Sequence, residues 1–244
     1  MRKLLLLFFV SPLALSNGNT TILSYSKANR LMQQEIFVGD HLQKTLYCGA
    51  AFNMNKEVYL PKGFTSTKYK NRLKKWEAEH ITSAESFGRN FLEWREGHPT
   101  CVDSEGRSFK GRSCARKTNT QYRLMEADLY NLYPAIGAVN GLRRNYNFTM
   151  IPNSDSNFGS CDMRIQNQKA QPPERARGYI SRAYLYMEQV YADYTMSSSQ
   201  KQLMQAWDKQ YPITSKECEI GNRIKSVQKS SNPIIETRCR ELSR

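Results

Sequence analysis

Six cysteines constrain the fold of this chain more than any other feature of its sequence. They are Cys48, Cys101, Cys114, Cys161, Cys218 and Cys239. None belongs to a C-x-x-C pair, the spacing typical of zinc sites and redox motifs. An even number of cysteines in an exported chain predicts three disulfides. Several pairings are open, but Cys101 and Cys114 bracket a polar, glycine-containing segment with few other means of staying ordered, so we expect these two to be joined.

The N-terminus indicates that the chain is exported. Arg2 and Lys3 precede an apolar run over residues 4–15. Ala14 and Ser16 are small residues at the positions that a signal peptidase requires for cleavage directly after Ser16. The run is shorter than the roughly 20 residues of a membrane-spanning helix, although a retained membrane anchor is the alternative. We expect a signal peptide and a mature protein in the periplasm or the medium.

The chain carries a strong excess of positive charge. Its net charge is +14, and loss of Arg2 and Lys3 with the signal peptide would leave +12 (14 − 2). Such a field attracts polyanions such as nucleic acid, anionic lipid or acidic polysaccharide, but it does not choose among them. Residues 17–244 show no repeat, no clear linker and no later apolar segment long enough to span a bilayer. We therefore expect one soluble, monomeric domain after cleavage.

Helical patterns dominate the second half of the chain. Capping boxes at Ser197 and Thr214 begin two of the predicted helices. Weak alternation before residue 65 predicts short strands, and the glycine-rich, charged stretch from residue 81 to 116 predicts loops. The predicted helices cover residues 26–46, 122–132, 174–191, 197–209 and 214–228, and the short strands lie within residues 47–64. Together these patterns predict a mainly helical α+β fold, with methionine and aromatic stripes in its core.

One of the three histidines, His80, stands in a segment suited to catalysis. It directly follows Glu79. Hydrolysis of a phosphodiester needs a base to take a proton from water and a cation to bear charge on the phosphate. A histidine suits the first task, and the oxygens of Glu79, Glu126 and Asn140 could bind Mg²⁺ or Ca²⁺ for the second. A Glu-His pair alone is weak evidence, because a single histidine is more often a packed or exposed residue.

Longer motifs carry a specific resemblance. The stretch YRLMEADLYNL fills residues 122–132, and PAIGAVNG fills residues 134–141. Further matching stretches cover residues 79–80, 87–88, 175–178, 182–187, 203–207, 211–212 and 232–233. In this order they resemble the endonuclease I family of bacterial periplasmic and secreted nucleases, which belongs to the ββα-metal (His-Me finger) group. The resemblance covers most of the mature chain and implies a single disulfide-stapled domain built around that finger.

The resemblance also implies a role for each site residue. His80 matches the general base that activates water, and Glu79 and Asn140 match the metal-binding positions. Glu126 matches a third acid at the metal, which it reaches directly or through water, and Arg112 is the candidate for an arginine set against the cleaved phosphate. The implied cofactor is Mg²⁺, with Ca²⁺ or Mn²⁺ as alternatives. The implied reaction cuts DNA and RNA to products that carry a 5′-phosphate.

The chain departs from the family pattern at three positions near these residues. Ala78 stands where the family usually has tryptophan before the Glu-His pair, and Ser83 stands in place of a proline. Tyr130 replaces a histidine that many relatives carry. None of these changes removes the base or a metal ligand, so we expect activity to survive.

Basic residues near the motifs could line a groove for the nucleic-acid backbone. They are Lys110, Arg112, Arg143, Arg144, Arg175 and Arg177. Phosphate contacts position nucleic acid without reading its sequence, so we expect little sequence preference and a steep loss of affinity with salt. For any one of these residues, a solvated basic face is an equally good interpretation.

Two other functions stay open from the sequence. A catalytically degenerate relative could be an exported protein that binds nucleic acid or another polyanion through its charge alone. A secreted hydrolase could act on another anionic polymer, although no separate motif indicates one. The retained Glu79, His80, Glu126 and Asn140 favour the nuclease, because binding alone requires none of them.

Overall fold

A computed structural model describes residues 18–243 of the chain. The predicted signal peptide and its cleavage site after Ser16 lie outside the described residues. Within residues 18–243, no helix is both long enough and apolar enough to cross a membrane. The fold is α+β and mainly helical, as the sequence predicts.

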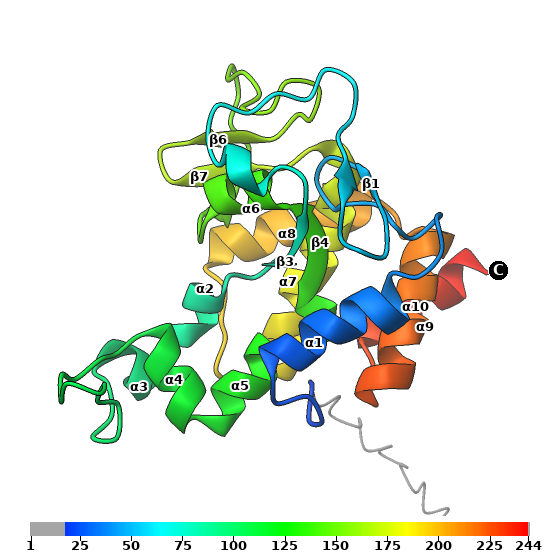
Figure 1. The fold of residues 1–244 in the computed structure, drawn as a ribbon. Coiled ribbons are helices and arrows are strands. Elements are labelled where there is room, and N and C mark those ends of the chain that lie inside the picture. Colours follow the sequence, from blue (N-terminus) through cyan, green and yellow to red (C-terminus); the bar gives the residue numbers. More distant parts are fainter. Residues whose placement is uncertain (1–17, 244) are drawn as a thin grey trace, which may run out of the picture.

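Helices are the main regular elements of the described chain (Figure 1). The α-helices are α1 (Tyr25–Leu31), α2 (Ala84–Gly88), α3 (Leu92–Arg95), α4 (Arg112–Thr118), α5 (Thr120–Glu126), α6 (Gly137–Arg143), α7 (Glu174–Val190), α8 (Ser198–Gln210), α9 (Ser215–Gln228) and α10 (Pro233–Leu242). The π-helix η1 (Met32–Ile36) continues α1, and the 3₁₀ helices are η2 (Lys70–Arg72) and η3 (Leu129–Asn131).

Three small sheets complete the fold. The strands are β1 (Ala51–Phe52), β2 (Val58–Tyr59), β3 (Trp76–His80), β4 (Leu132–Ile136), β5 (Asn147–Phe148), β6 (Arg164–Gln166) and β7 (Lys169–Gln171). β1 pairs with β2, β3 pairs antiparallel with β4, and the third sheet has the order β5-β7-β6. In Figure 1 the β3–β4 sheet lies in the middle of the molecule, with α3–α5 towards one end and the β6–β7 hairpin towards the other.

Three disulfides join the six cysteines. Cys101 is bonded to Cys114, the pair expected from the sequence. The other two bonds join Cys48 to Cys161 and Cys218 to Cys239. The Cys48–Cys161 bond spans 113 residues, so it ties the N-terminal half of the fold to the loop before β6.

Several helix boundaries differ from the sequence prediction. The first helix ends at Ile36 instead of residue 46, because Gly39 takes a positive φ of 97° and the chain turns. Residues 122–132 are not one helix: α5 ends at Glu126, and the Asp128 side chain accepts a hydrogen bond from the Tyr130 amide and begins η3. Leu132 therefore starts β4. The segment predicted to be loops contains α2, α3 and most of α4, and α10 was not predicted.

The long C-terminal helices follow the prediction closely. α7 buries Ile180, Ala183 and Tyr184 against the rest of the core. Ser197 caps α8 and Thr214 caps α9, each by accepting a hydrogen bond from the amide three residues later. The second half of the Thr214 box does not form, because the Glu217 carboxylate is buried and bonded to Arg182 at 2.6 Å instead.

Candidate active site

The β3–β4 sheet and the helix that follows it position the predicted site. Alternate residues of a strand point to the same face, so Glu77 and Glu79 of β3 share one. α6 begins directly after β4 and carries Asn140 and Arg143, which contact Glu77 and Glu79 respectively. The junction between β4 and α6 requires glycine at position 137, since a Cβ there would lie 2.6 Å from the Arg72 carbonyl oxygen. This tight turn brings the helix against the strand.

His80 is the last residue of β3, and its ring is held in one orientation. Nε2 lies 2.8 Å from the backbone carbonyl oxygen of Glu126. A carbonyl oxygen only accepts, so Nε2 carries the hydrogen and Nδ1 keeps its lone pair. The ring stacks on Tyr25 with centroids 5.1 Å apart and is 7% exposed. Burial, followed by the nearby Arg112 charge, lowers the pKa of His80 to about 4, so the imidazole is neutral.

Glu79 is buried beside His80, and only one of its two carboxylate oxygens accepts hydrogen bonds within the described chain. Its Oε1 accepts hydrogen bonds from the Tyr47 hydroxyl at 2.6 Å and from Arg143 Nη1 at 2.9 Å. Burial raises the pKa of this carboxyl, and the Arg143 charge opposes that shift. Oε2 has no hydrogen-bond partner among the described residues, and Glu79 lines a cleft. The second carboxylate oxygen is therefore free to bind a cation.

Arg143 lines the cleft with a buried side chain whose hydrogen bonds stabilise the site. Its side chain is 1% exposed. Besides Glu79, it donates to the backbone carbonyls of His80 and Ile81, and it lies 4.5 Å from the Phe148 ring centroid. These bonds occupy its guanidinium group within the protein, and its expected contact with the nucleic-acid backbone stays a prediction. Through these bonds Arg143 connects the end of β3 to α6.

Glu77 orients Asn140, and the sequence analysis did not single it out. Asn140 Nδ2 donates to Glu77 Oε2 at 2.8 Å, and Arg72 pairs with both oxygens of Glu77. Because the amide nitrogen faces Glu77, the amide oxygen is left available to a cation or to water. The position of Glu77 two residues before Glu79 on one strand is the signal that could have found it.

The Glu126 carboxylate is bonded to two arginines. Its carboxylate is 1% exposed and accepts from Arg112 Nε at 2.6 Å, from Arg116 Nη2 at 2.6 Å and from Arg116 Nε at 2.8 Å. It does not line the cleft that contains Glu79 and Asn140. Both of its oxygens are occupied by arginines, which outweigh burial and lower its pKa. The carboxylate is bound to guanidinium groups instead of facing the cleft.

A cleft of about 530 Å³ brings Glu79, His80, Arg112 and Asn140 together. It is lined by Tyr25, Arg72, Glu77, Ala78, Glu79, His80, Ser83, Ala84, Glu85, Trp94, Arg112, Asn140, Gly141, Arg143, Arg144 and Asn145. Residues 18–243 contain no group of three or more histidine, cysteine or acidic side chains that could hold a metal. Mg²⁺ needs fewer, since it binds one or two protein oxygens and keeps its water. The free oxygens of Glu79 and Asn140 fit that requirement.

Two arginines of the cleft are suited to a phosphate. Arg112 starts α4 and lies 5.4 Å from the Tyr25 ring centroid, and its Nη2 is buried without a hydrogen-bond partner in the described chain. Arg144 follows α6 with a positive φ of 53°, a conformation that costs energy for a residue with a side chain. Both therefore place guanidinium groups at the cleft wall.

The remaining basic residues of the prediction lie outside the cleft. Lys110 and Arg175 do not line it. The guanidinium of Arg175 lies so close to Gly49 that a Cβ there would be 1.5 Å from Nη1. Arg177 is buried and donates to the Tyr211 hydroxyl at 2.7 Å, and its expected contact with the nucleic-acid backbone stays a prediction.

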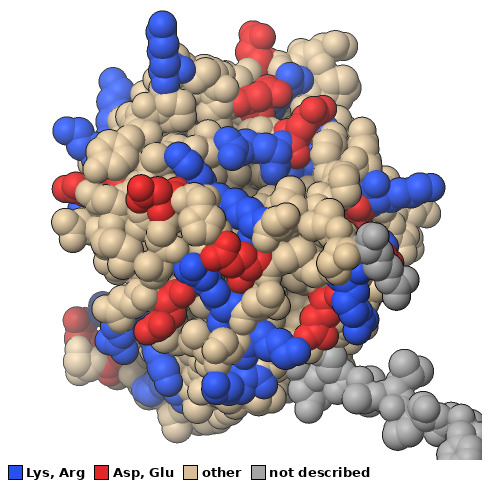
Figure 2. Space-filling view, turned by 90° about the vertical axis from the view of Figure 1, so that its right-hand side faces the viewer, with Lys and Arg blue, Asp and Glu red and all other residues tan. Residues whose placement is uncertain are grey.

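On the face that Figure 2 shows, positive charge is spread out and is not gathered into one patch. Figure 2 shows the side of the molecule that lies on the right in Figure 1, where α9 and α10 are found. Lysine and arginine side chains cover this face, with acidic side chains among them. This general field attracts polyanions, and the cleft must supply the chemistry.

Comparisons with known proteins identify the family. The family model for endonuclease I matches residues 19–239. The chain is 36% identical to a periplasmic deoxyribonuclease of Aeromonas hydrophila over 80% of this chain and 79% of that protein. It is 35% identical to an extracellular deoxyribonuclease of the same species over 86% of each chain. It is 33% identical to endonuclease-1 of Buchnera aphidicola subsp. Acyrthosiphon pisum over 80% of this chain and 74% of that protein. The resemblance found in the sequence is thus confirmed, and the chain belongs to the endonuclease I family.

Proposed function

We propose that the chain is an exported, metal-dependent endonuclease that hydrolyses phosphodiester bonds of DNA and RNA without sequence preference. The observation that carries the proposal is the fixed orientation of His80. Its Nε2–H is bonded to the Glu126 carbonyl oxygen, and its Nδ1 lone pair is left free beside a cleft. A binding protein has no need of a buried imidazole held in one tautomer, whereas a general base does.

The same cleft supplies the other two requirements of the reaction. The free oxygens of Glu79 and Asn140 would hold a divalent cation, Mg²⁺ by preference. Bound there, the cation would neutralise charge on the phosphate and on the leaving 3′ oxygen, so the product carries a 5′-phosphate. Arg112 would contact the phosphate oxygens, and His80 Nδ1 would take a proton from the attacking water. The order β3, β4, α6 agrees with a ββα-metal finger, in which the histidine ends one strand and the asparagine lies on the helix.

Glu126 takes a different role in this proposal from the one that the resemblance implies. Its carboxylate holds Arg112 and Arg116, so it acts as a positioning residue for Arg112 instead of a metal ligand. Its backbone carbonyl separately orients His80. One residue thereby fixes both the base and the arginine that faces the phosphate.

The substrate and the location follow from the charge and the relatives. A net charge of +14 attracts nucleic acid, and contacts to phosphate favour neither base sequence nor sugar type. The relatives are named as periplasmic and extracellular enzymes, and three disulfides suit an oxidising compartment. We therefore place the mature chain in the periplasm or the medium.

Digestion of a plasmid and of a single-stranded RNA by the mature protein tests this function. We expect cleavage with Mg²⁺ and none with EDTA. His80→Ala should lower the cleavage rate by about 10²- to 10⁴-fold while DNA binding in EDTA is retained. His98→Ala is the matched control, since this exposed ring bonds only to Thr100 and lies outside the cleft. Cleavage by His80→Ala at the wild-type rate would contradict the proposal.

A further inference from the structure

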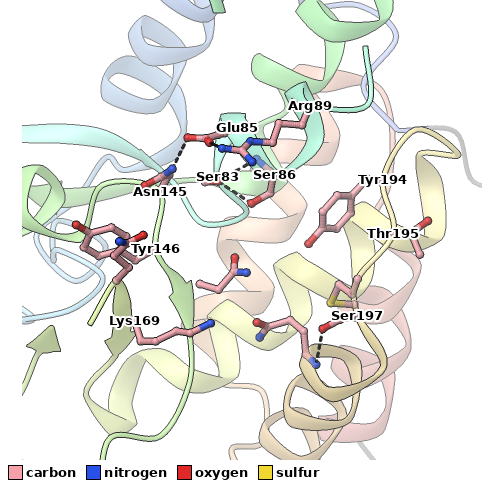
Figure 3. Close-up of a pocket in the computed structure, with 14 residues that line it drawn as sticks. Ser83, Glu85, Ser86, Arg89, Asn145, Tyr146, Lys169, Tyr194, Thr195 and Ser197 are labelled. Atoms are coloured by element: carbon pink, nitrogen blue, oxygen red, sulfur yellow. Dashed lines mark hydrogen bonds and ion pairs between the residues drawn. The ribbon is translucent and has the colours of Figure 1, made fainter. Parts of the chain in front are cut away.

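A second recess opens beside the cleft. It has a volume of about 370 Å³ and lies between α2, the turn that joins β6 to β7, and the start of α8 (Figure 3). Ser83, Glu85 and Asn145 line both the recess and the cleft. Asn145 Nδ2 donates to Glu85 across this shared wall. A chain that lies in the cleft can therefore continue into the recess.

The charges in the recess favour an anion. Glu85 is bonded to both Arg89 and Asn145, so its charge is offset. Lys169 is exposed at the start of β7 and makes no ion pair within the described chain. Figure 3 shows its side chain extending into the recess. Arg89 and Lys169 thus accompany the single carboxylate of Glu85, and within residues 18–243 Lys169 has no ion-pair partner.

The rest of the lining is suited to a base. Tyr146 offers an aromatic ring at the side nearer the cleft, and aromatic rings stack on any base. Gln200 Nε2 is buried and has no hydrogen-bond partner in residues 18–243. Gln168 occupies the β6–β7 turn with a positive φ of 58°, a position that glycine would fill without strain. Positive φ at both Asn167 and Gln168 is the conformation of a two-residue type I′ hairpin turn, and this turn places Gln168 at the recess.

We propose that this recess binds one unpaired nucleotide of the substrate strand, next to the phosphate that is cut. The inference rests on the proposed nuclease function. Lys169 contacts the phosphate of that nucleotide, Tyr146 stacks on its base, and Gln200 donates to the edge of the base. A base inside a duplex presents only its edges, so a recess of this size receives a base only from an unpaired segment.

Kinetics on two substrates test the proposal. One is a single-stranded oligonucleotide, and the other is a hairpin duplex of the same composition. We expect Lys169→Met to raise KM for the single strand about tenfold, as loss of one charged contact does, with kcat unchanged. The same variant should change KM for the duplex by less than about twofold. The control is Lys209→Met, at an exposed position in the last turn of α8. It should change KM by less than about twofold for both substrates. Equal effects on both substrates, or no difference between the two variants, overturn the proposal.

A binding measurement separates this proposal from the proposed function. Fluorescence anisotropy with the labelled single strand in EDTA requires no cleavage. We expect Lys169→Met to weaken this binding about tenfold and to reduce the slope of log affinity against log salt by about 0.7, the value for one phosphate contact on a single strand. If the wild-type chain cleaves neither substrate but binds the single strand more tightly than Lys169→Met, with the larger salt slope, the nuclease function is refuted and the nucleotide site in the recess is supported. If wild-type binding equals that of Lys169→Met, the recess fails alone.

Discussion

Replacement of Glu126 by glutamine distinguishes its two possible roles. As a metal ligand, Glu126 would set the Mg²⁺ concentration that activates the enzyme. As a positioning residue, it would set how well Arg112 meets the phosphate. In the structure its carboxylate is 1% exposed and is bonded to Arg112 and Arg116 outside the cleft. We expect Glu126→Gln to lower kcat/KM without changing the Mg²⁺ requirement.

The size of the effect follows from the three hydrogen bonds that the arginines donate to this carboxylate. Glutamine keeps an oxygen that can accept from Arg112, but it places an NH₂ group against the Arg116 donor and removes the charge. A hydrogen bond to a charged group contributes about 1.5–3 kcal/mol. Arg112 and Arg116 are 41% and 46% exposed, so water compensates part of the loss and the lower end applies. We expect about 1.5 kcal/mol less stability and, if Arg112 loses its fixed geometry, about a tenfold lower kcat/KM.

A double-mutant cycle with Arg112→Ala measures whether the two residues act together. We expect Arg112→Ala to lower kcat/KM about 100-fold, as loss of a charge-stabilising donor does, and Glu126→Gln to add little on top of it. Arg116→Ala is the matched control, because it removes two bonds to the same carboxylate and leaves the bond to Arg112. Two results together would refute the positioning role and support the metal role: losses of kcat/KM that add in the double variant, and a Mg²⁺ concentration for half-activation that shifts more than about tenfold in Glu126→Gln.

Three further predictions concern stability and binding. Asp128→Asn should lower the free energy of unfolding in urea by about 3 kcal/mol, since the carboxylate accepts from five donors and an amide would oppose some of them; an unchanged midpoint would contradict this. The Cys48→Ala, Cys161→Ala double variant should lose about 4 kcal/mol, because the bond closes a loop of 113 residues, and a melting temperature equal to that of the wild type would contradict the loop argument. Arg144→Ala should reduce the slope of log affinity against log salt for duplex binding by about 0.9. Replacement of the buried Arg177 by alanine should leave this slope unchanged and lower the stability of the fold. The reverse pattern would place the phosphate contact at Arg177.

The elements that the sequence predicted well are those with strong local signals. α7, α8 and α9 each have apolar residues at helical spacing or a capping residue at their start. Local signals failed where tertiary contacts decide the outcome. The α5 pattern runs on through Leu132, but β4 has its partner in β3, and pairing with His80 requires Leu132 to be extended. Glu217 completes a capping box in sequence and forms a buried ion pair in the structure.

The candidate site could be assembled from the sequence only in part. Glu79, His80 and Asn140 meet at one cleft, as the resemblance implies. The partners of Glu126 could not be predicted, because α4 and α5 meet at Asn119 at an angle that spacing does not reveal. The sequence prediction treated the basic residues near the motifs as one class, but in the structure some of them are buried and others are exposed. Both Arg143 and Arg144 line the cleft, but Arg143 is buried and Arg144 is exposed.

The two functions of residue 126 make its variants informative about the whole site. The His80 contact uses the backbone carbonyl, which every substitution except those that disturb α5 preserves. A loss of activity in Glu126→Gln therefore does not come from a misoriented base. It must come through the arginines or through the metal, and those two routes differ in their response to Mg²⁺ and to Arg112→Ala. Because Arg143 independently ties β3 to α6, the frame that holds Glu79 and Asn140 stays in place when the carboxylate is changed.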